Sequence, residues 1–238
     1  MSGHSKWSTI KRQKGVTDAK RSQVFTKLAK LITVAARQGA DPTMNFKLRL
    51  AIAKARDASM PKENIDRAVR RGAGNDDGAQ LEELTYEGYG PGGVAFLMEV
   101  LTDNRNRTIS NIRHILERFG GRLADSGSVA WMFSTKNLVQ LALPVKDCEN
   151  LELALIEAGA DDIKEFVDEL IIISPPDKST VINKLLLERN LTPSYSAIEP
   201  VANNFINISD EQLTVRLDKL REALNSDDDI NNIYDNAD

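Results

Sequence analysis

The spacing of apolar residues changes once along the chain, near residue 81, and that change constrains the fold more than any other feature. Before it, apolar residues recur at the 3.6-residue spacing of amphipathic helices over residues 17–38, 44–58 and 61–71. After it, short apolar runs bounded by Gly and Pro predict strands with helices between them. The sequence therefore predicts an N-terminal three-helix domain followed by α+β structure, with residues 72–80 as the linker.

Each of the three predicted helices combines one apolar stripe with recognisable end signals. Thr17 suits the N-cap of the first helix and Gly39 its end, while Pro61 suits the first turn of the third helix. Basic residues lie off the apolar stripes. The residues predicted to face the core are Val24, Phe25, Leu28, Leu31, Ile32, Ala35, Ala36, Met44, Leu48, Ala51, Ile52, Ala55, Ile65, Ala68 and Val69.

The strand and helix order after residue 81 predicts two ferredoxin-like units, one inserted in the other. Residues 137–199 follow the order βαββαβ, which is the ferredoxin-like arrangement. The remaining segments are strands at 84–90, 93–102, 128–134, 203–209 and 229–235 and helices at 107–119 and 210–225. When the inserted residues 137–199 are left out, the segments from 93–102 onward also follow the order βαββαβ.

We therefore expect three domains: residues 1–80, residues 81–136 plus 200–238, and an inserted domain at 137–199. Pro200 is expected to mark the crossing between the two α+β domains, because proline interrupts a strand. Two separate α+β domains in series are the alternative.

The charged residues are also distributed unevenly along the chain, with the basic excess in the N-terminal part. Residues 1–74 carry a balance of +12 and residues 75–238 a balance of −16, which together give the net charge of −4. Such an uneven charge distribution is typical of a protein in which a basic domain binds an anionic partner. The acidic remainder of the chain then repels non-specific polyanions. Electrostatic attraction between the chain's own domains, or binding to an acidic protein partner, are the alternatives.

Other features narrow the class of protein. The single cysteine, Cys148, excludes an intramolecular disulfide and fits a reducing compartment. The sequence holds no apolar run long enough to span a bilayer, no secretory signal and no HExxH, CxxC or GxSxG motif. We expect a cytoplasmic protein without membrane contact, cofactor, metal, small-molecule substrate or catalytic residues.

The N-terminal stretch KWSTIKRQKG, residues 6–15, has four positive charges and no acidic residue. Lys6, Lys11, Arg12 and Lys14 would attract phosphates, and Trp7 would stack on an unpaired base. In the alternative, Trp7 packs on the first helix and the lysines remain solvated.

Two glycine- or arginine-rich segments admit ligand-binding interpretations. TDNRNRT, residues 102–108, leads into a predicted helix, so Arg105 and Arg107 with the helix amides would bind an anion. Its alternative is an Asp or Asn cap with arginines paired to neighbouring acids. GYGPGG, residues 88–93, lacks a Gly-Lys-Ser/Thr ending and precedes a strand, which favours a tight hairpin turn over a phosphate loop.

Several motifs resemble the YebC/PmpR family. They are GHSKW at 3–7, DAKRSQVFTKL at 18–28, AKARDASMPKENIDRAV at 53–69, YEGYGPGGVA at 86–95 and LTDNRNRT at 101–108. The resemblance implies an N-terminal helical domain and two α+β domains. It also implies a role as a probable DNA-binding transcriptional regulator. Mitochondrial relatives are translational activators and bacterial relatives are linked to stalled ribosomes, so the resemblance implies a role in translation as the other possibility.

We therefore predict a non-enzymatic nucleic-acid-binding regulator, with DNA-binding transcriptional regulation as the leading role. A ribosome-associated RNA-binding translation factor that relieves stalling is the alternative, because phosphate attraction is common to both. The target sequence, partner proteins and oligomeric state are not predicted. The predicted nucleic-acid-binding residues are Lys6, Trp7, Lys11, Arg12, Lys14, Lys20, Arg21, Lys27, Lys30, Arg37, Lys54, Lys62, Arg67, Arg70, Arg71, Arg105 and Arg107.

Overall fold

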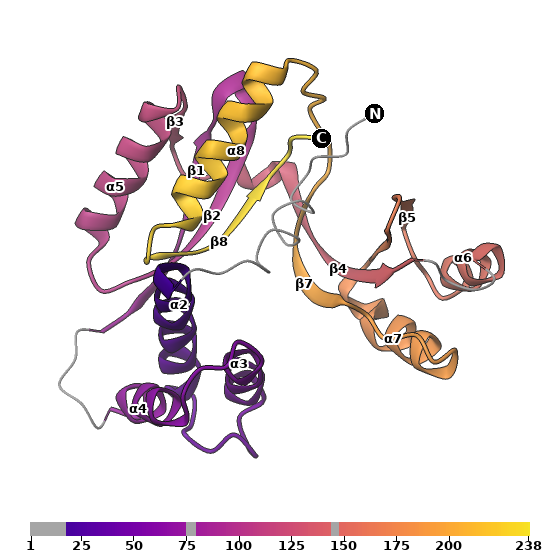
Figure 1. Cartoon of the computed structure of the whole chain (residues 1–238), viewed down its shortest axis with the longest axis horizontal. Coiled ribbons are helices and arrows are strands. Elements are labelled where there is room, and N and C mark those ends of the chain that lie inside the picture. The colour runs from indigo at the N-terminus through magenta and orange to yellow at the C-terminus, as the bar shows by residue number, and fades with distance from the viewer. Residues whose placement is uncertain (1–17, 75–79, 144–147) are drawn as a thin grey trace. The chain divides into compact units, whose positions relative to one another are not determined.

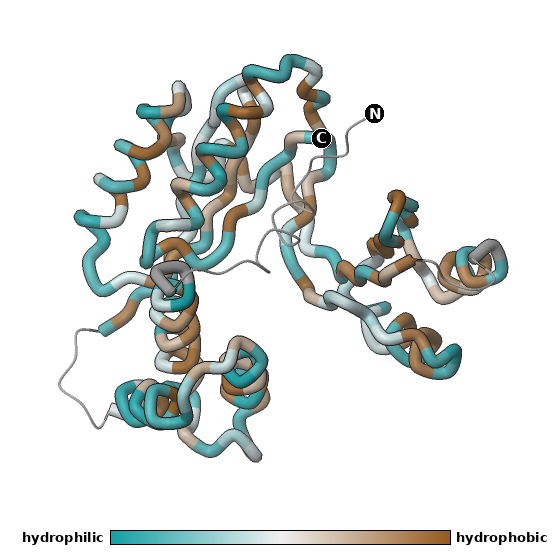
Figure 2. The backbone as a smooth tube through the Cα atoms, viewed as in Figure 1, coloured by the Kyte–Doolittle hydropathy of each residue, from teal (hydrophilic) through white to brown (hydrophobic). Residues whose placement is uncertain are grey.

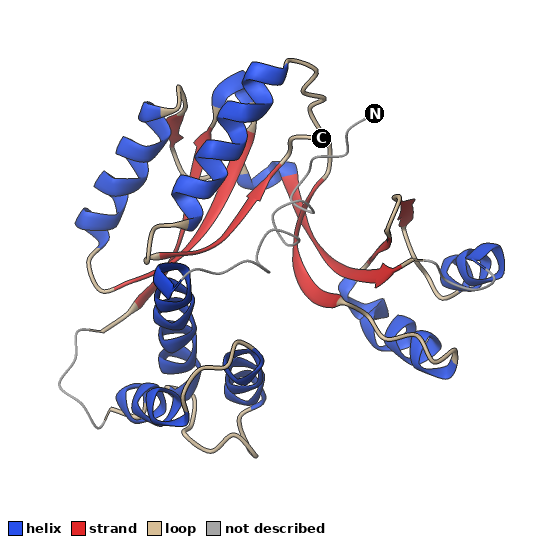
Figure 3. Cartoon of the chain, viewed as in Figure 1, coloured by secondary structure: helices blue, strands red, loops and turns tan. Residues whose placement is uncertain are grey.

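The computed structural model describes residues 18–74, 80–143 and 148–238 (Figure 1). Among the described residues, three N-terminal helices are followed by two groups that each combine strands with helices (Figure 3). The expected fold class, a helical domain followed by two ferredoxin-like α+β domains with one inserted in the other, is confirmed. The boundaries predicted for the three domains remain a prediction.

The helical domain consists of α2 (Asp18–Ala36), α3 (Phe46–Asp57) and α4 (Lys62–Gly72). Its core contains the residues predicted for it on α3 and α4, with Leu48, Ile52 and Ala55 packed against Ile32 and Ile65. Figure 2 shows brown apolar and teal polar residues alternating along such helices. The predicted N-cap Thr17 lies outside the described residues.

Met44 is an exception to the predicted core. Its side chain is 87% exposed, because the residue precedes α3 and the cap of that helix is Asn45. The Asn45 side chain accepts a hydrogen bond from the Leu48 amide and donates to the carbonyls of Ala35 and Gly39. Asn45 therefore fixes the start of α3 against the end of α2.

Gly72 allows α2 and α4 to approach closely. A Cβ atom at Gly72 would lie 2.2 Å from the carbonyl oxygen of Thr33 and 2.6 Å from the Cβ of Ala36. The Thr33 hydroxyl also donates to the carbonyl of Ala68 at 3.2 Å. The absence of a side chain at Gly72 is therefore a packing requirement of the helical domain.

The turn between α3 and α4 contains a strained residue. Ser59 has φ of 61°, in the left-handed region, and the amides of Ser59 and Met60 donate to the carbonyls of Arg56 and Ala55. This is the Schellman arrangement of a helix C-terminus, in which the left-handed position usually holds Gly. The equivalent positions after α5 (Arg105–Arg118) and α6 (Cys148–Glu157) are Gly120 and Gly159.

We expect Ser59→Gly to raise the free energy of unfolding by about 0.5–1 kcal/mol, because relief of left-handed strain exceeds the added flexibility of glycine in the unfolded chain. Urea denaturation followed by circular dichroism measures the change. Ser59→Ala is the control, since alanine keeps the Cβ responsible for the strain. An equal gain with alanine would contradict the explanation.

The first α+β sheet has the order β3-β1-β2-β8 with antiparallel pairing. Its strands are β1 (Glu82–Tyr89), β2 (Ala95–Thr102), β3 (Arg122–Ala124) and β8 (Ile230–Asp235). Helices α5 and α8 (Glu211–Asn225) cover one face of it (Figure 1). Leu116 and Leu220 pack there against Phe96 and Met98 of β2. The predicted turn at 88–93 is confirmed, with Gly92 and Gly93 at φ of 74° and 75°.

Two predicted strands of this sheet are wrong. Residues 203–209, all of them described, form no strand, and one bridge pairs Ile206 with Ala237. The strand β1, which lies outside the predicted βαββαβ order, pairs with β2. Residues 128–134 do not form a separate strand: residues 130–132 are a short 3-10 helix, and residues 133–134 begin a strand of the second sheet. The buried Glu87 carboxylate holds the preceding turn by accepting hydrogen bonds from the amides of Gly127, Val129 and Ala130.

Residues 131–205 form a compact unit of their own with the sheet order β5-β6-β4-β7. The strands are β4 (Phe133–Ala142), β5 (Asp162–Glu165), β6 (Glu169–Ser174) and β7 (Tyr195–Ala202). Helices α6 and α7 (Ser179–Glu188) contribute Leu155 and Ile182 to its core. Pro200 does not interrupt a strand as expected; it pairs with Thr135 within β7, an edge strand, where proline is tolerated.

Candidate nucleic-acid interface

Exposed basic side chains are concentrated on the helical domain. Residues 18–74 hold 13 Lys and Arg residues against 5 Asp and Glu. Seven of the predicted binding residues are exposed and form no ion pair among the described residues; these are Arg21, Arg37, Lys54, Lys62, Arg67, Arg70 and Arg71. The helices thus present a cationic surface that is open to an anionic partner.

The predicted N-terminal arm lies outside the described residues. This applies to Lys6, Trp7, Lys11, Arg12 and Lys14, so both interpretations of Trp7 remain predictions. Lys20 belongs to α2, but its side chain is likewise outside the description.

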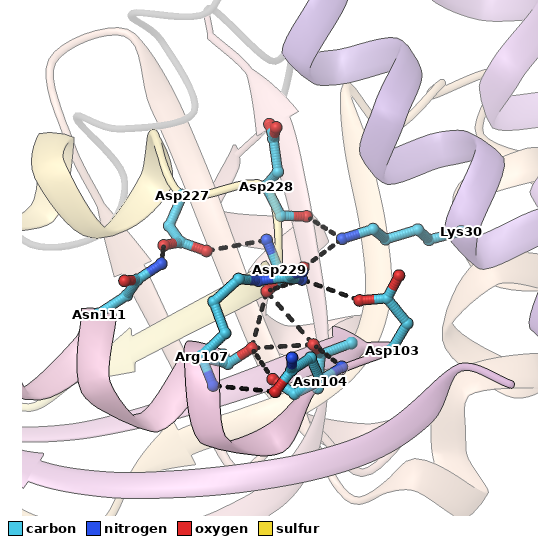
Figure 4. A network of polar contacts seen from close by, with 10 residues as sticks. Lys30, Asp103, Asn104, Arg107, Asn111, Asp227, Asp228 and Asp229 are labelled. Atoms are coloured by element: carbon cyan, nitrogen blue, oxygen red, sulfur yellow. Dashed lines mark hydrogen bonds and ion pairs between the residues drawn. The ribbon is translucent and has the colours of Figure 1, made fainter. Parts of the chain in front are cut away.

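Two predicted residues of α2 bind the chain's own acidic loop. The Lys30 ammonium lies 2.5 Å from the Asp229 carboxylate and 2.8 Å from the carbonyl of Asp228. The Lys27 ammonium donates to the carbonyl of Asn225 at 2.7 Å. We call this contact between α2 and residues 225–229 the α2 latch; Figure 4 shows Lys30 reaching Asp229. It matches the alternative of attraction between the chain's own domains.

Asp229 is the centre of a buried polar network. Its side chain is 5% exposed and accepts hydrogen bonds from Arg107 at 2.8 Å and from the Thr108 hydroxyl at 2.7 Å, besides Lys30 (Figure 4). Burial opposes ionisation, but these donors and the Lys30 charge outweigh it and lower the pKa of Asp229 to about 2. A carboxylate therefore holds α2 against the start of α5.

The TDNRNRT segment adopts the second of its two alternatives. Asn104 caps α5 by accepting from the Arg107 amide, and Arg107 pairs with Asp103 at 2.9 Å as well as with Asp229. The Arg105 guanidinium lies 3.8 Å from Glu82. Arg105, Arg107 and Lys30 form ion pairs with acidic groups of the chain, and Lys27 donates a hydrogen bond to a carbonyl. These four residues are therefore not part of the proposed interface.

Burial lowers the pKa of Lys27 to about 8, and the charges of Asp227 and Asp228 oppose this shift only in part. A lysine with a lowered pKa in the folded state destabilises the protein at neutral pH. Stability should therefore rise with pH between about 8 and 10.5, as the unfolded chain still binds the proton that the folded chain has lost.

We expect Lys27→Met to raise the free energy of unfolding at pH 7 by about 1–2 kcal/mol, after allowance for the lost hydrogen bond. It should also remove the rise in stability above pH 8. Denaturation curves collected across this pH range measure both effects, with the exposed Lys54→Met as control. Retention of the alkaline rise in Lys27→Met would assign it to another group.

Three exposed cations and one aromatic residue of α3 were not among the predicted binding residues. They are Lys47, Arg49, Arg56 and Phe46, whose side chain is 62% exposed. The Arg49 guanidinium lies over the Phe46 ring, 5.2 Å from its centroid. Heptad spacing from Lys47 to Lys54 and from Arg49 to Arg56 was the available signal, since it aligns these charges along the helix.

Within the described ranges, no group of three or more His, Cys, Asp or Glu residues is arranged to hold a metal ion. Across the same ranges, no helix has both the length and the apolar character required to cross a membrane.

Known protein families and structures are similar to this chain over nearly its whole length. Residues 5–75 match the TACO1/YebC protein N-terminal domain and residues 81–237 match the TACO1/YebC second and third domain. A crystal structure of a conserved hypothetical protein from Aquifex aeolicus superposes with a TM-score of 0.83 at 38% identity, covering 98% of this chain and 97% of that chain.

Proteins of two bacteria illustrate the sequence similarity. Probable transcriptional regulatory proteins of Koribacter versatilis and Moorella thermoacetica are 44% and 45% identical, over 100% of this chain and 96% of each relative. The fold and these matches define a protein with a basic helical domain ahead of two α+β domains. The chain belongs to the TACO1/YebC family.

Proposed function

We propose that this protein is a nucleic-acid-binding regulatory protein whose helical domain contacts the phosphate backbone. The observation that carries the proposal is the set of exposed cations on α3 and α4, among them Lys54, Arg67 and Arg71, which lack ion-pair partners among the described residues. Solvated cations that meet phosphates release condensed counterions, and this release drives binding.

The charge of the rest of the chain sets how the protein approaches its partner. Residues 75–238 carry a balance of −16, so they repel a polyanion while the helical domain attracts it. Binding therefore orients the protein with the helices toward the nucleic acid. Six to eight phosphate contacts would produce a slope of log K against log salt of about −5 to −7.

DNA is the leading target, in a transcriptional role, because relatives that match this chain over its full length are named probable transcriptional regulatory proteins. In this proposal the protein acts in the cytoplasm and has neither a catalytic role nor a cofactor. RNA in a translational role is the second candidate. The exposed Phe46 beneath the Arg49 guanidinium favours it, since aromatic and arginine planes stack on unpaired bases.

Crosslinking in cells, followed by parallel sequencing of bound DNA and bound RNA from one lysate, tests the proposal. Enrichment at discrete promoters would support the transcriptional role. Enrichment on ribosomal RNA would support the translational role. Absence of enrichment in both libraries, from cells in which the protein is abundant, would contradict nucleic-acid binding itself.

A further inference from the structure

A hollow of about 480 Å³ opens on the helical domain between α3, α4 and the loop that precedes α3. This volume lies within the range of roughly 300–1,000 Å³ that is typical of sites for small organic ligands. The hollow is lined by Ala40, Pro42, Ile52, Arg56, Met60, Lys62, Ile65, Asp66, Val69 and Arg70.

The lining combines an apolar floor with a cationic rim. Ile52, Met60 and Ile65 are each at most 7% exposed and belong to the domain core. Met60 is held there by its amide, which donates to the carbonyl of Ala55 in the turn at Ser59. The floor is therefore formed by packed side chains and is present before any ligand arrives.

Three exposed cations and one carboxylate surround this floor. Lys62, Asp66 and Arg70 follow each other at four-residue intervals and so project from one side of α4, while Arg56 approaches from the last turn of α3. None of the four forms an ion pair among the described residues. The rim thus carries an excess of positive charge available to an anionic ligand.

We infer that the hollow takes one unpaired nucleotide of a single-stranded nucleic acid, an inference that rests on the proposed function. The base enters the apolar floor, as extruded bases do in pockets lined by apolar side chains. Its flanking phosphates lie against Arg56, Lys62 and Arg70, and Asp66 accepts a hydrogen bond from a base amino group. Base-paired DNA cannot occupy the hollow in this way without extruding a base.

Exposed residues of α3 continue the site beyond the hollow. Phe46, Arg49 and Arg56 lie at spacings of three and seven residues, on one side of the helix. Phe46 is about 15 Å along the helix axis from Arg56. A strand leaving the hollow along α3 therefore passes the Arg49 guanidinium and reaches the Phe46 ring, where a further base stacks.

Fluorescence anisotropy with the full-length protein tests this inference, using labelled short single strands of DNA and of RNA and a DNA duplex of the same length. Ala40→Trp fills the hollow without a change in charge, at an exposed position of the lining. We expect at least about tenfold weaker binding of single strands, with duplex affinity and the salt slope unchanged.

A double variant, Arg56→Ala with Arg70→Ala, removes two cations of the rim. It should weaken single-strand binding at least tenfold and reduce the salt slope by about 0.7 for each lost contact. The matched control, Lys54→Ala with Arg67→Ala, removes two exposed cations that do not line the hollow. We expect this control to weaken the binding of single strands and the binding of duplex by similar factors.

The outcomes separate this inference from the proposed function. If the wild-type protein binds nucleic acid but Ala40→Trp binds single strands as tightly as wild type does, the hollow is not a nucleotide site and the proposed function stands. If the wild-type protein binds none of the three probes at low salt, both fail. Loss confined to single-stranded RNA, or to single-stranded DNA, would support the inference and identify the natural strand.

Discussion

Asp229→Ala is expected to lower the free energy of unfolding by about 3–5 kcal/mol. The substitution leaves Lys30, whose side chain is 18% exposed, and Arg107 without their shared carboxylate, and it leaves the buried Thr108 hydroxyl with one acceptor fewer. Loss of the buried carboxylate costs this much because Lys30 stays largely desolvated and the buried Thr108 hydroxyl loses an acceptor, whereas Arg107, 48% exposed, keeps its ion pair with Asp103.

Urea denaturation of the full-length protein measures the effect. Asp228→Ala is the matched control, since the Asp228 side chain is exposed and its carbonyl, the group that contacts Lys30, is retained. We expect a change below about 0.5 kcal/mol for the control. Equal effects of the two substitutions would show that general charge, and not the α2 latch, stabilises the protein.

The same carboxylate makes stability depend on acid pH. The pKa of Asp229 is lowered from 3.8 to about 2, so its contribution is fully present above about pH 4 and is lost as pH falls toward 2. The lowered pKa corresponds to roughly 2 kcal/mol. In Asp229→Ala this part of the acid dependence should disappear; an acid profile identical to that of the wild type would contradict it.

Charge reversal on the helical domain is expected to reduce nucleic-acid affinity by about a hundredfold or more near physiological salt. The triple variant Lys54→Glu, Arg67→Glu and Arg71→Glu removes three exposed cations and adds repulsion at the same positions. Each lost duplex contact should also flatten the salt slope by about 0.9. Anisotropy titrations at several salt concentrations measure both quantities.

A control with the same change in net charge separates local contact from overall repulsion. Arg113→Glu, Arg216→Glu and Lys219→Glu reverse three exposed cations on α5 and α8 of the first α+β sheet. If the helical domain is the interface, this control retains most of the affinity. Similar losses in the two triple variants would remove the helical domain from the proposed interface.

The helices were predictable because each depends on a local pattern. Apolar spacing along α3 placed Leu48 and Ile52 in the core correctly. Met44 continues the same spacing but precedes the capping residue Asn45, whose contacts with Ala35 and Gly39 depend on how the chain turns back. Periodicity therefore identified the helix and misjudged its first turn.

Strand partners were harder to predict, because one apolar strand can replace another in an antiparallel sheet. The segment 203–209 has the composition of a strand, yet β1 pairs with β2 over residues 82–89 and occupies the neighbouring position. The turn at 127–130 depends on Glu87, about forty residues earlier. Such contacts between distant segments leave little trace in local sequence.

Some residues of the candidate site were predictable from local sequence, and others depend on contacts between distant segments. Exposed cations such as Lys54 and Arg67 followed from helical spacing alone. The pairing of Lys30 with Asp229 joins residues 199 positions apart, and Asp229 resembles its neighbours Asp227 and Asp228 in sequence. The hollow likewise exists only once α3 and α4 are packed together.

The residues that crosslink to nucleic acid identify the surface of the protein that contacts it. The full-length protein is irradiated with bound nucleic acid, digested, and its crosslinked peptides are identified by mass spectrometry. We predict crosslinks within α3 and α4, including peptides that contain Arg56, Phe46 or Arg67, and few within residues 131–205. Crosslinks confined to the two α+β sheets, with none in the helical domain, would contradict this prediction.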